Sequence, residues 1–469
     1  ELALDENGKF LAVRVHNVGN IGAQALHLVP LCRGAAVTNG VYVVPHIHAR
    51  LQAVFTNTVP ISTYRGAGRP ESIFIIERLI DAAAAETGID RFELRRRNFI
   101  EPAMLPWVSP LGTRYDSGEF ATNMDRALGM ADEPGIAERR EAARARGRVH
   151  GFGIGNYIET ATGIPFERAV VELEPERVRI TLGTQASGQG HETSFAQVMV
   201  ELLGVPFERV ELRQGDTDFV LMGSGSHSSR SMRLGGLLLG RAAAEVVEKA
   251  RPVAARALQA APDELVFADG RFTVPDSERS VDLFDVAKLA ADMPEDEHAA
   301  LRASADITTM LPTFPNGCHC CEVEIDPDTG RIDVTRYCAV DDVGRIINPM
   351  LVDGQTHGST AQGIGQALIE ECVFDPESGQ MLSGSFMDYA MPRADMLPSF
   401  VLANNEVPAP NNPLGIKGAG EGGTTGAPPA VVNAVVDALR AYGVTDVPMP
   451  MTPERVWRVL QRGADTKSC

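Results

Sequence analysis

Apolar and polar positions alternate along much of the chain in a pattern that predicts short strands joined by tight turns. Apolar runs at residues 2–4 and 10–15 flank an Asp-Glu-Asn-Gly turn at residues 5–8. The same arrangement recurs at residues 322–340, where a turn at residues 326–330 separates two β-rich runs. Because such turns between apolar runs are typical of antiparallel hairpins, we expect a hairpin at each place.

Other segments carry apolar residues at the spacing of helices. Residues 70–86 place Ile73, Ile76 and Ile80 on one stripe and stop before Gly88. Helices are also predicted at residues 192–203, 350–370, 428–442 and 452–462, with Gly463 as the stop of the last. The hairpins and helices do not alternate strictly. The expected fold class is therefore α+β, with mixed sheets, antiparallel hairpins and packed helices.

A chain of 469 residues is too long for one ordinary hydrophobic core. We place a domain boundary at the charged, Ala-rich stretch of residues 132–148, which predicts domains at residues 1–131 and 132–469. The first residue is Glu1 rather than methionine, and the chain opens directly on a predicted hairpin. From this opening we expect further polypeptide upstream.

Composition and charge exclude several classes of protein. A formal net charge of −19 repels phosphate backbones, so nucleic acid is not expected as a partner. No apolar run approaches the roughly 20 residues that a membrane helix needs, so no membrane span is expected. The 7 cysteines are odd in number and form no disulfide framework, which indicates free thiols in a reducing cytoplasm.

Glycines collect in four short runs, at residues 66–68, 188–191, 223–231 and 415–423. Runs of Gly, Ser and Gln let the backbone approach a ligand and expose N–H and hydroxyl donors, which suits an anionic ligand with many acceptor atoms. No Walker P-loop is present. Residues 418–423 fit Gly-x-Gly-x-x-Gly but do not follow a buried strand, so a dinucleotide site is not predicted. Four such runs indicate one shared ligand.

Glu421 is the most informative single residue. It is a carboxylate within a loop of glycine and alanine, with Lys417 as the nearest charge in the sequence. A carboxylate with few solvating side chains can serve as a general base, although an exposed loop acid is the alternative. The cluster at residues 318–321 contains possible metal ligands. However, strand alternation would send Cys318 and Cys320 to the face opposite His319 and Cys321, so no zinc site is predicted.

Several of these segments together resemble molybdenum hydroxylase large subunits of the xanthine dehydrogenase, aldehyde oxidase and carbon monoxide dehydrogenase type, in the molybdopterin-binding C-terminal part. The matching motifs lie in the family's order and cover most of the chain, which is more specific than any one of them. They are Thr-Tyr-Arg-Gly-Ala-Gly-Arg-Pro-Glu at 63–71, Gly-Gln-Gly-His-Glu at 188–192, Ser-His-Ser-Ser-Arg-Ser at 226–231, the stretches at 320–326, 341–349 and 354–365, and Lys-Gly-Ala-Gly-Glu at 417–421 through Asn433.

The resemblance implies a role for each matching residue. Glu421 would lie beside molybdenum as the catalytic base, and Arg65 would stabilise negative charge that develops on the substrate. Molybdenum would be held through the pterin dithiolene, without a protein ligand. The residues implied to bind the cofactor are Gly66, Gln189, Gly190 and His191 (the last three at its phosphate end), Ser228, Ser229 and Ser231, Cys320 and Gln362 along the pterin, and Gly420.

The implied activity is oxidation of an aldehyde or an aromatic N-heterocycle with oxygen derived from water. The implied cofactor is molybdenum–molybdopterin in its cytosine dinucleotide form. Implied partners are an iron–sulfur subunit, an FAD subunit and the upstream part of the large subunit, assembled as a dimer of heteromers. The family's Gly-Gly-Phe-Gly loop and a cofactor-contacting glutamine would precede residue 1, so this chain alone should form an incomplete pocket.

Three alternatives stay open. One is a reductive member of the family that acts on an aromatic thioester, and another is a non-catalytic scaffold subunit. The third is a carbon monoxide dehydrogenase-like enzyme. Those enzymes carry a copper-binding cysteine directly after the loop arginine, where this chain has Gly66, which argues against a copper–sulfur–molybdenum centre.

Overall fold

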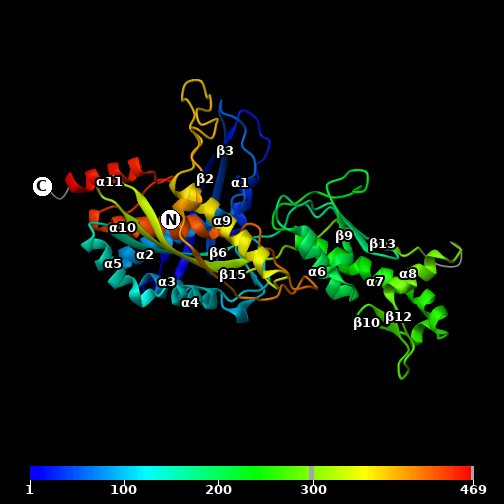
Figure 1. The fold of residues 1–469 in the computed structure, drawn as a ribbon. Coiled ribbons are helices and arrows are strands. Elements are labelled where there is room, and N and C mark those ends of the chain that lie inside the picture. The colour runs from blue at the N-terminus through cyan, green and yellow to red at the C-terminus, as the bar shows by residue number, and fades with distance from the viewer. Residues whose placement is uncertain (295–299, 466–469) are drawn as a thin grey trace.

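The computed structural model describes residues 1–294 and 300–465, which form two lobes (Figure 1). One lobe contains both ends of the chain, and the other is formed by the segment between residues 159 and 315. The strand that leads into this segment, β6 (Val149–Ile158), pairs along its whole length with the strand that follows it, β14 (Asn316–Ile325). The second lobe is therefore an insertion between two neighbouring strands of the first.

The sheets combine parallel and antiparallel pairing. The first lobe has three sheets. One has the strand order β1 (Leu2–Leu4), β2 (Phe10–Gly22), β3 (His46–Phe55), and another has the order β16 (Phe400–Asn404), β15 (Ile332–Asp342), β14, β6. The third is the pair of β4 (Trp107–Val108) and β5 (Arg114–Tyr115). In the second lobe, the orders are β13 (Arg302–Ile307), β7 (Glu167–Leu173), β8 (Val178–Leu182), β9 (Val210–Arg213) and β10 (Val266–Ala268), β11 (Arg271–Thr273), β12 (Ser280–Asp282).

Helices cover these sheets in both lobes (Figure 1). Those of the first lobe are α1 (Val29–Cys32), α2 (Arg69–Thr87), α3 (Arg91–Arg96), α4 (Phe120–Met130), α5 (Ile136–Ala145), α9 (Pro349–Leu368), α10 (Gly422–Leu439) and α11 (Pro453–Asp465). Those of the second lobe are α6 (His191–Leu203), α7 (Ser231–Leu258) and α8 (Leu283–Ala291).

The structure confirms the α+β fold class and most predicted elements. The β1–β2 and β14–β15 hairpins pair in antiparallel register, and α2 ends at Gly88 with a left-handed backbone as expected for a glycine stop. Two helix ends were predicted wrongly. The helix expected from residue 428 already begins at Gly422, with Pro428 and Pro429 inside it, and α11 continues past Gly463 to Asp465. The long helix α7 was not predicted.

The central sheet of the first lobe lies between two apolar cores. Cys318 and Cys320 belong to the core on one face, whereas Cys321 belongs to the core on the other, next to α10. Strand alternation therefore distributes this cluster as predicted. The first of these cores contains both Phe120 and Phe152, so residues on either side of the expected boundary at 131/132 pack together. The stretch of residues 132–148 includes α5, which packs against β6.

Helix α10 packs unusually closely on β6, and this contact places the start of the helix. A Cβ atom at Gly153 would collide with the backbone of Ala430 and Ala434, so glycine is required for the approach. The helix is buried along almost its whole length. Its N-terminus, and Glu421 directly before it, are therefore fixed relative to the sheet.

Six cysteines are described, all as free thiols, and only Cys32 and Cys372 are exposed. Among residues 1–294 and 300–465, no helix combines the length and the apolar character needed to cross a bilayer.

Candidate active site

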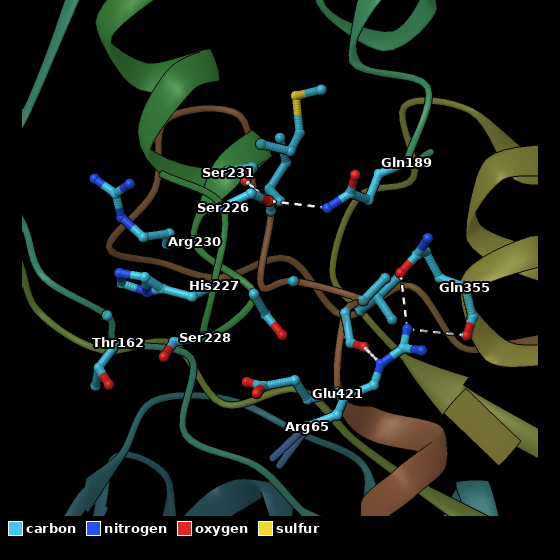
Figure 2. A pocket seen from close by; sticks show the side chains of 18 of the residues that line it. Arg65, Thr162, Gln189, Ser226, His227, Ser228, Arg230, Ser231, Gln355 and Glu421 are labelled. Carbon is cyan, nitrogen blue, oxygen red and sulfur yellow. Dashed lines mark hydrogen bonds between the residues drawn. The ribbon is translucent and has the colours of Figure 1, made fainter. Parts of the chain in front are cut away.

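A cavity of about 600 Å³ lies between the two lobes. Its wall includes residues from all four glycine-rich runs, as the sequence predicted. In Figure 2, Glu421 and Arg65 lie at the lower edge of this cavity, and Gln189, Ser226 and Ser231 lie at the upper edge. The first lobe therefore contributes a carboxylate and a guanidinium, and the second lobe contributes amide and hydroxyl groups.

Glu421 occupies the N-cap position of α10 and is only 9% exposed. Its Oε1 accepts a hydrogen bond of 2.9 Å from the backbone N–H of Gly66, and its Oε2 accepts one of 2.9 Å from Nη2 of Arg69. Both carboxylate oxygens are thus oriented by donors while the group still lines the cavity. A fixed carboxylate at the wall of a cavity has the geometry required of a general base.

Lys417 is not the charge that faces Glu421, as the sequence had suggested. Its fully buried Nζ lies 2.5 Å from Oδ2 of Asp342 and donates to the carbonyl of Ser117. Arg69 is the cation that contacts Glu421. It belongs to the same Tyr-Arg-Gly-Ala-Gly-Arg run as Arg65, and its place at the start of α2 brings it back toward α10.

The loop before Glu421 is held by backbone contacts. The N–H groups of Lys417 and Gly418 donate to the carbonyl of Val343, and the hydroxyl of Thr313 donates to the carbonyl of Lys417. Gly418 has a φ of +132°, and a Cβ atom there would lie 2.8 Å from Cβ of Ser229. Glycine is therefore required where this loop meets the run of residues 223–231 in the second lobe, called the serine-rich run below.

Arg65 connects the Glu421 loop to helix α9. Its Nη1 donates to Oε1 of Gln362 at 2.9 Å, its Nη2 donates to Oε1 of Gln355 at 2.8 Å, and its Nε donates to the carbonyl of Gly420. Figure 2 shows Arg65 beside Gln355. Burial lowers the pKa of Arg65, and the charge of Glu421 opposes this shift. The guanidinium is thus fixed within the cavity wall.

The upper edge of the cavity contains the N-termini of α6 and α7 together with a chain of hydroxyl groups. Nε2 of Gln189 donates to the hydroxyl of Ser226, which lies 2.7 Å from the hydroxyl of Ser231. His191 bonds to the carbonyl of Thr184 through Nδ1, and burial lowers its pKa, so this ring is neutral at pH 7. Two helix N-termini with hydroxyl donors favour a ligand rich in anionic oxygens.

The serine-rich run is held in an uncommon backbone conformation. Ser228 and Ser229 both have positive φ angles, of 50° and 54°, and the buried hydroxyl of Ser229 has no hydrogen-bond partner within the described chain. The neighbouring Arg230 is fully buried and pairs with Glu167 at 3.0 Å. An unpaired hydroxyl at the wall of a cavity points to a bound ligand, since buried polar groups are normally satisfied. These residues therefore fit an acceptor-rich cofactor.

The structure brings most of the predicted site residues to this cavity, but not all. Two predictions are corrected. Cys320 packs in the apolar core because its strand face points away from the cavity, and Gln362 orients Arg65 instead of lining the wall. Gly66 donates its backbone N–H to Glu421. Gly190 is the N-cap residue of α6 and does not line the cavity, whereas its neighbours Gln189 and His191 do. The predicted residues that line the cavity are Arg65, Gln189, His191, Ser228, Ser229, Ser231, Gly420 and Glu421.

Sequence reasoning missed a second carboxylate. Glu159, the residue after β6, is fully buried, and its Oε1 accepts a hydrogen bond of 2.6 Å from the same Nη2 of Arg69 that contacts Glu421. Gln355 was also missed. The sequence carried no pairing signal for Glu159, because its partners Arg69 and Glu421 lie far away along the chain.

Comparisons with known proteins agree with this geometry. Residues 1–99 and 129–398 match the molybdopterin cofactor-binding domain. The chain is 37% identical, over 98% of its length and 59% of the relative, to the 6-hydroxypseudooxynicotine dehydrogenase complex subunit gamma of Paenarthrobacter nicotinovorans. It is 34% identical, over 98% of its length and 59% of the relative, to the nicotine 6-hydroxylase large subunit of the same organism. It therefore spans about three fifths of the length of these relatives.

Solved structures lead to the same family. Quinoline 2-oxidoreductase from Pseudomonas putida 86 superposes with a TM-score of 0.91 at 36% identity, over 98% of this chain and 61% of that one. A Cu,Mo-CO dehydrogenase superposes with a TM-score of 0.92 at 31% identity, over 99% of this chain and 61% of that one. The chain belongs to the molybdopterin-binding large-subunit family of the molybdenum hydroxylases.

Proposed function

We propose that this chain provides the cofactor pocket and the catalytic base of a molybdenum hydroxylase. The observation that carries the proposal is the position of Glu421, which is held between the Gly66 N–H and Arg69 at the wall of the cavity. The opposite edge of the same cavity presents helix N-termini and hydroxyl groups. A base and an anion-binding edge in one cavity suit a phosphorylated cofactor placed next to a reacting substrate.

The residues of this chain would act in distinct ways. Gln189, His191 and the serine-rich run would hold the phosphate end of the cofactor, and Glu421 would accept the proton released when oxygen from water adds to the substrate carbon. Arg65 would stabilise negative charge on the substrate. When bound, the molybdenum cofactor supplies the two-electron redox chemistry.

The substrate class is proposed from the relatives and from the cavity. The names of the similar proteins include nicotine, 6-hydroxypseudooxynicotine and quinoline, which favour an aromatic N-heterocycle over an aldehyde. The cavity contains the apolar side chains of Val29, Ile164, Leu351 and Val352 as well as the polar groups described above. Such a wall suits a flat, largely apolar ring with few polar atoms.

The finer features are also proposals. The cofactor would be the cytosine dinucleotide form, and electrons would leave through an iron–sulfur subunit and an FAD subunit in a cytoplasmic dimer of heteromers. Names such as large subunit and subunit gamma support a multi-subunit enzyme. The division into residues 1–131 and 132–469 would follow the two family matches, which end at residue 99 and begin again at residue 129, although one apolar core extends across the boundary.

Metal analysis of the protein purified with its native partners tests the proposal. Molybdenum near one per catalytic unit, without copper, is the expected result. Absence of both metals would favour the scaffold alternative. Molybdenum together with copper would favour a carbon monoxide dehydrogenase, to which the chain is also similar.

Gly66 provides a sharper test against the copper-dependent alternative. It has a φ of +99°, and a Cβ atom there would lie 2.7 Å from Cδ of Pro70. We expect Gly66→Cys to gain neither copper nor CO oxidation, because a side chain displaces the N–H that orients Glu421. Turnover of the native substrate should fall by about tenfold to a hundredfold, as expected for a displacement on the order of 1 Å.

Gly66→Ala is the matched control, because it adds the same Cβ atom without a thiol. Both variants should lose similar amounts of activity and keep their molybdenum. Copper content and CO oxidation are measured by elemental analysis and by CO-dependent dye reduction. A gain of both in the cysteine variant alone would contradict the expected displacement of the Gly66 N–H, whereas copper and CO oxidation in the wild type would contradict the assignment.

A further inference from the structure

Glu159 and Glu421 form a pair of carboxyl groups that shares one cation. Nη2 of Arg69 lies 2.6 Å from Oε1 of Glu159 and 2.9 Å from Oε2 of Glu421. The side chains of Arg69, Glu159 and Glu421 are 3%, 0% and 11% exposed. Two ionised carboxylates on one guanidinium would leave one negative charge in the protein interior without a hydrogen-bonded cation of its own, which is unfavourable. One shared proton makes the group neutral.

We propose that Glu159 is a positioning residue that holds this proton and thereby keeps Glu421 ionised and oriented toward the cavity. The proposal rests on the function proposed above for Glu421. It adds a role for a residue that does not line the cavity. No electron transfer is involved, and the proton resides on Oε2 of Glu159.

The hydrogen bonds indicate which carboxyl group holds the proton. Oε2 of Glu159 is buried and has no partner among the described residues when it is treated as an acceptor. As a hydroxyl it can donate, and a hydrogen-bonding interaction with Glu421 is among the causes that raise the pKa of Glu159. Glu421 already accepts bonds from the Gly66 N–H and from Arg69, and both bonds favour its ionised form. The proton is therefore assigned to Glu159.

The surrounding charges are consistent with this assignment. Arg233, on α7, directs its terminal nitrogens to the carbonyls of Leu311 and Thr162 instead of to Glu159. Tyr157, on β6, donates its hydroxyl to Asp341. Arg69 on α2 is thus the cation that hydrogen-bonds to Glu159.

Burial raises the pKa of Glu159 to about 8, with Arg69 opposing the shift and the charge of Glu421 adding to it. Because the folded-state pKa is raised, the neutral carboxyl stabilises the fold fully below its unfolded-state pKa of about 4.3. That stabilisation is lost as the pH rises through about 8. Above this pH Glu159 is also negatively charged, so it repels Glu421 and weakens the bond of Glu421 to Arg69.

Infrared spectroscopy of the purified holoenzyme tests the proposal without turnover. Wild-type protein should show the carbonyl stretch of a protonated carboxylic acid near neutral pH, and this band should disappear on alkaline titration. The difference spectrum of wild type minus Glu159→Gln should contain this band, which separates Glu159 from other buried carboxyl groups such as Asp342. Glu322→Gln is the control, because Glu322 is equally buried but its contacts with His150 and Arg139 lower its pKa, so the band should remain.

Labelling the protein with 13C-glutamate provides a second measurement. The band should shift with the label, since it belongs to glutamate. Absence of the band from the difference spectrum of wild type minus Glu159→Gln, or a difference band that does not shift with the label, would overturn the proposal. This result does not depend on molybdenum or on a substrate, so it is distinguishable from failure of the proposed function.

Enzyme kinetics report whether the protonation state of Glu159 affects Glu421. In wild type, kcat should fall at alkaline pH as Glu159 ionises, whereas KM should change less. In Glu159→Gln this alkaline ionisation should disappear, because an amide cannot titrate. A merely structural role would lower activity equally at every pH, so an unchanged alkaline limb in the variant would contradict the proposal.

Discussion

Replacing Glu421 with glutamine is expected to lower kcat by about 10²- to 10⁴-fold, which is the usual contribution of a general base. Molybdenum content should stay near that of wild type, because Glu421 lies across the cavity from Gln189, Ser226 and Ser231, the groups that would hold the phosphate end of the cofactor. The amide cannot accept a proton at neutral pH. Steady-state kinetics and metal analysis on the same preparation measure both effects.

The structure also predicts a smaller packing effect in this variant. Glutamine presents one acceptor oxygen, so either the Gly66 N–H or Arg69 loses its partner. Such a loss costs about 1–3 kcal/mol, and thermal unfolding should detect it. Glu192→Gln is the control, because it removes the same charge from an exposed position on α6. Near-normal turnover in Glu421→Gln would remove this residue from the role of base.

The sequence predicted the parts of the site that depend on local chemistry. Glycine-rich runs have few uses other than tight turns and close approach to a ligand, so their convergence on one cavity could be expected. Glu421 was identified because a carboxylate is conspicuous among glycines. Helices such as α2 carried both an apolar stripe and a glycine stop.

The sequence could not predict which distant residues meet. Arg69 and Glu159 are 90 positions apart, and Arg69 and Glu421 are 352 apart, so neither pair leaves a local signal. Strand alternation correctly separated Cys320 from Cys321 but could not tell which face would be near the cavity. Proximity in sequence suggested Lys417 as the neighbour of Glu421, although the loop turns that side chain toward Asp342.

Two further differences between the predicted and the observed fold also arise from contacts between residues far apart in the sequence. Pro428 and Pro429 normally mark the start of a helix, but tight packing on β6 maintains helical geometry for six residues before them. The pairing of β6 with β14 defines the two-lobe architecture, and it joins strands separated by the whole second lobe. Tertiary contacts thus overrode local preference at the element that carries Glu421.

The buried Lys417–Asp342 pair anchors the loop that leads to Glu421, and its disruption should cause a large loss of stability. Both side chains are fully buried, and removing one partner of such a pair costs about 3–5 kcal/mol. We therefore expect Lys417→Met to lower the free energy of unfolding by about this amount. Urea denaturation of the wild type and the variant measures the difference.

The pH dependence of this loss follows from Asp342. Burial raises its pKa even in the presence of Lys417, and removal of the lysine should raise the pKa further. The carboxyl can then stay protonated at lower pH, which limits the cost of leaving it without a cation. The stability of Lys417→Met should accordingly fall, relative to wild type, as the pH rises through the raised pKa of Asp342.

A double variant separates charge from packing. Lys417→Met with Asp342→Asn leaves no unpaired charge, and the amide oxygen can still accept from the backbone N–H of Gly344. It should regain more than half of the lost stability, since an uncompensated charge dominates the cost. Lys249→Met is the matched control, because its pair with Glu245 is partly exposed on α7 and is worth about 0.5 kcal/mol. A double variant as unstable as Lys417→Met would show that the lysine contributes packing and not charge compensation.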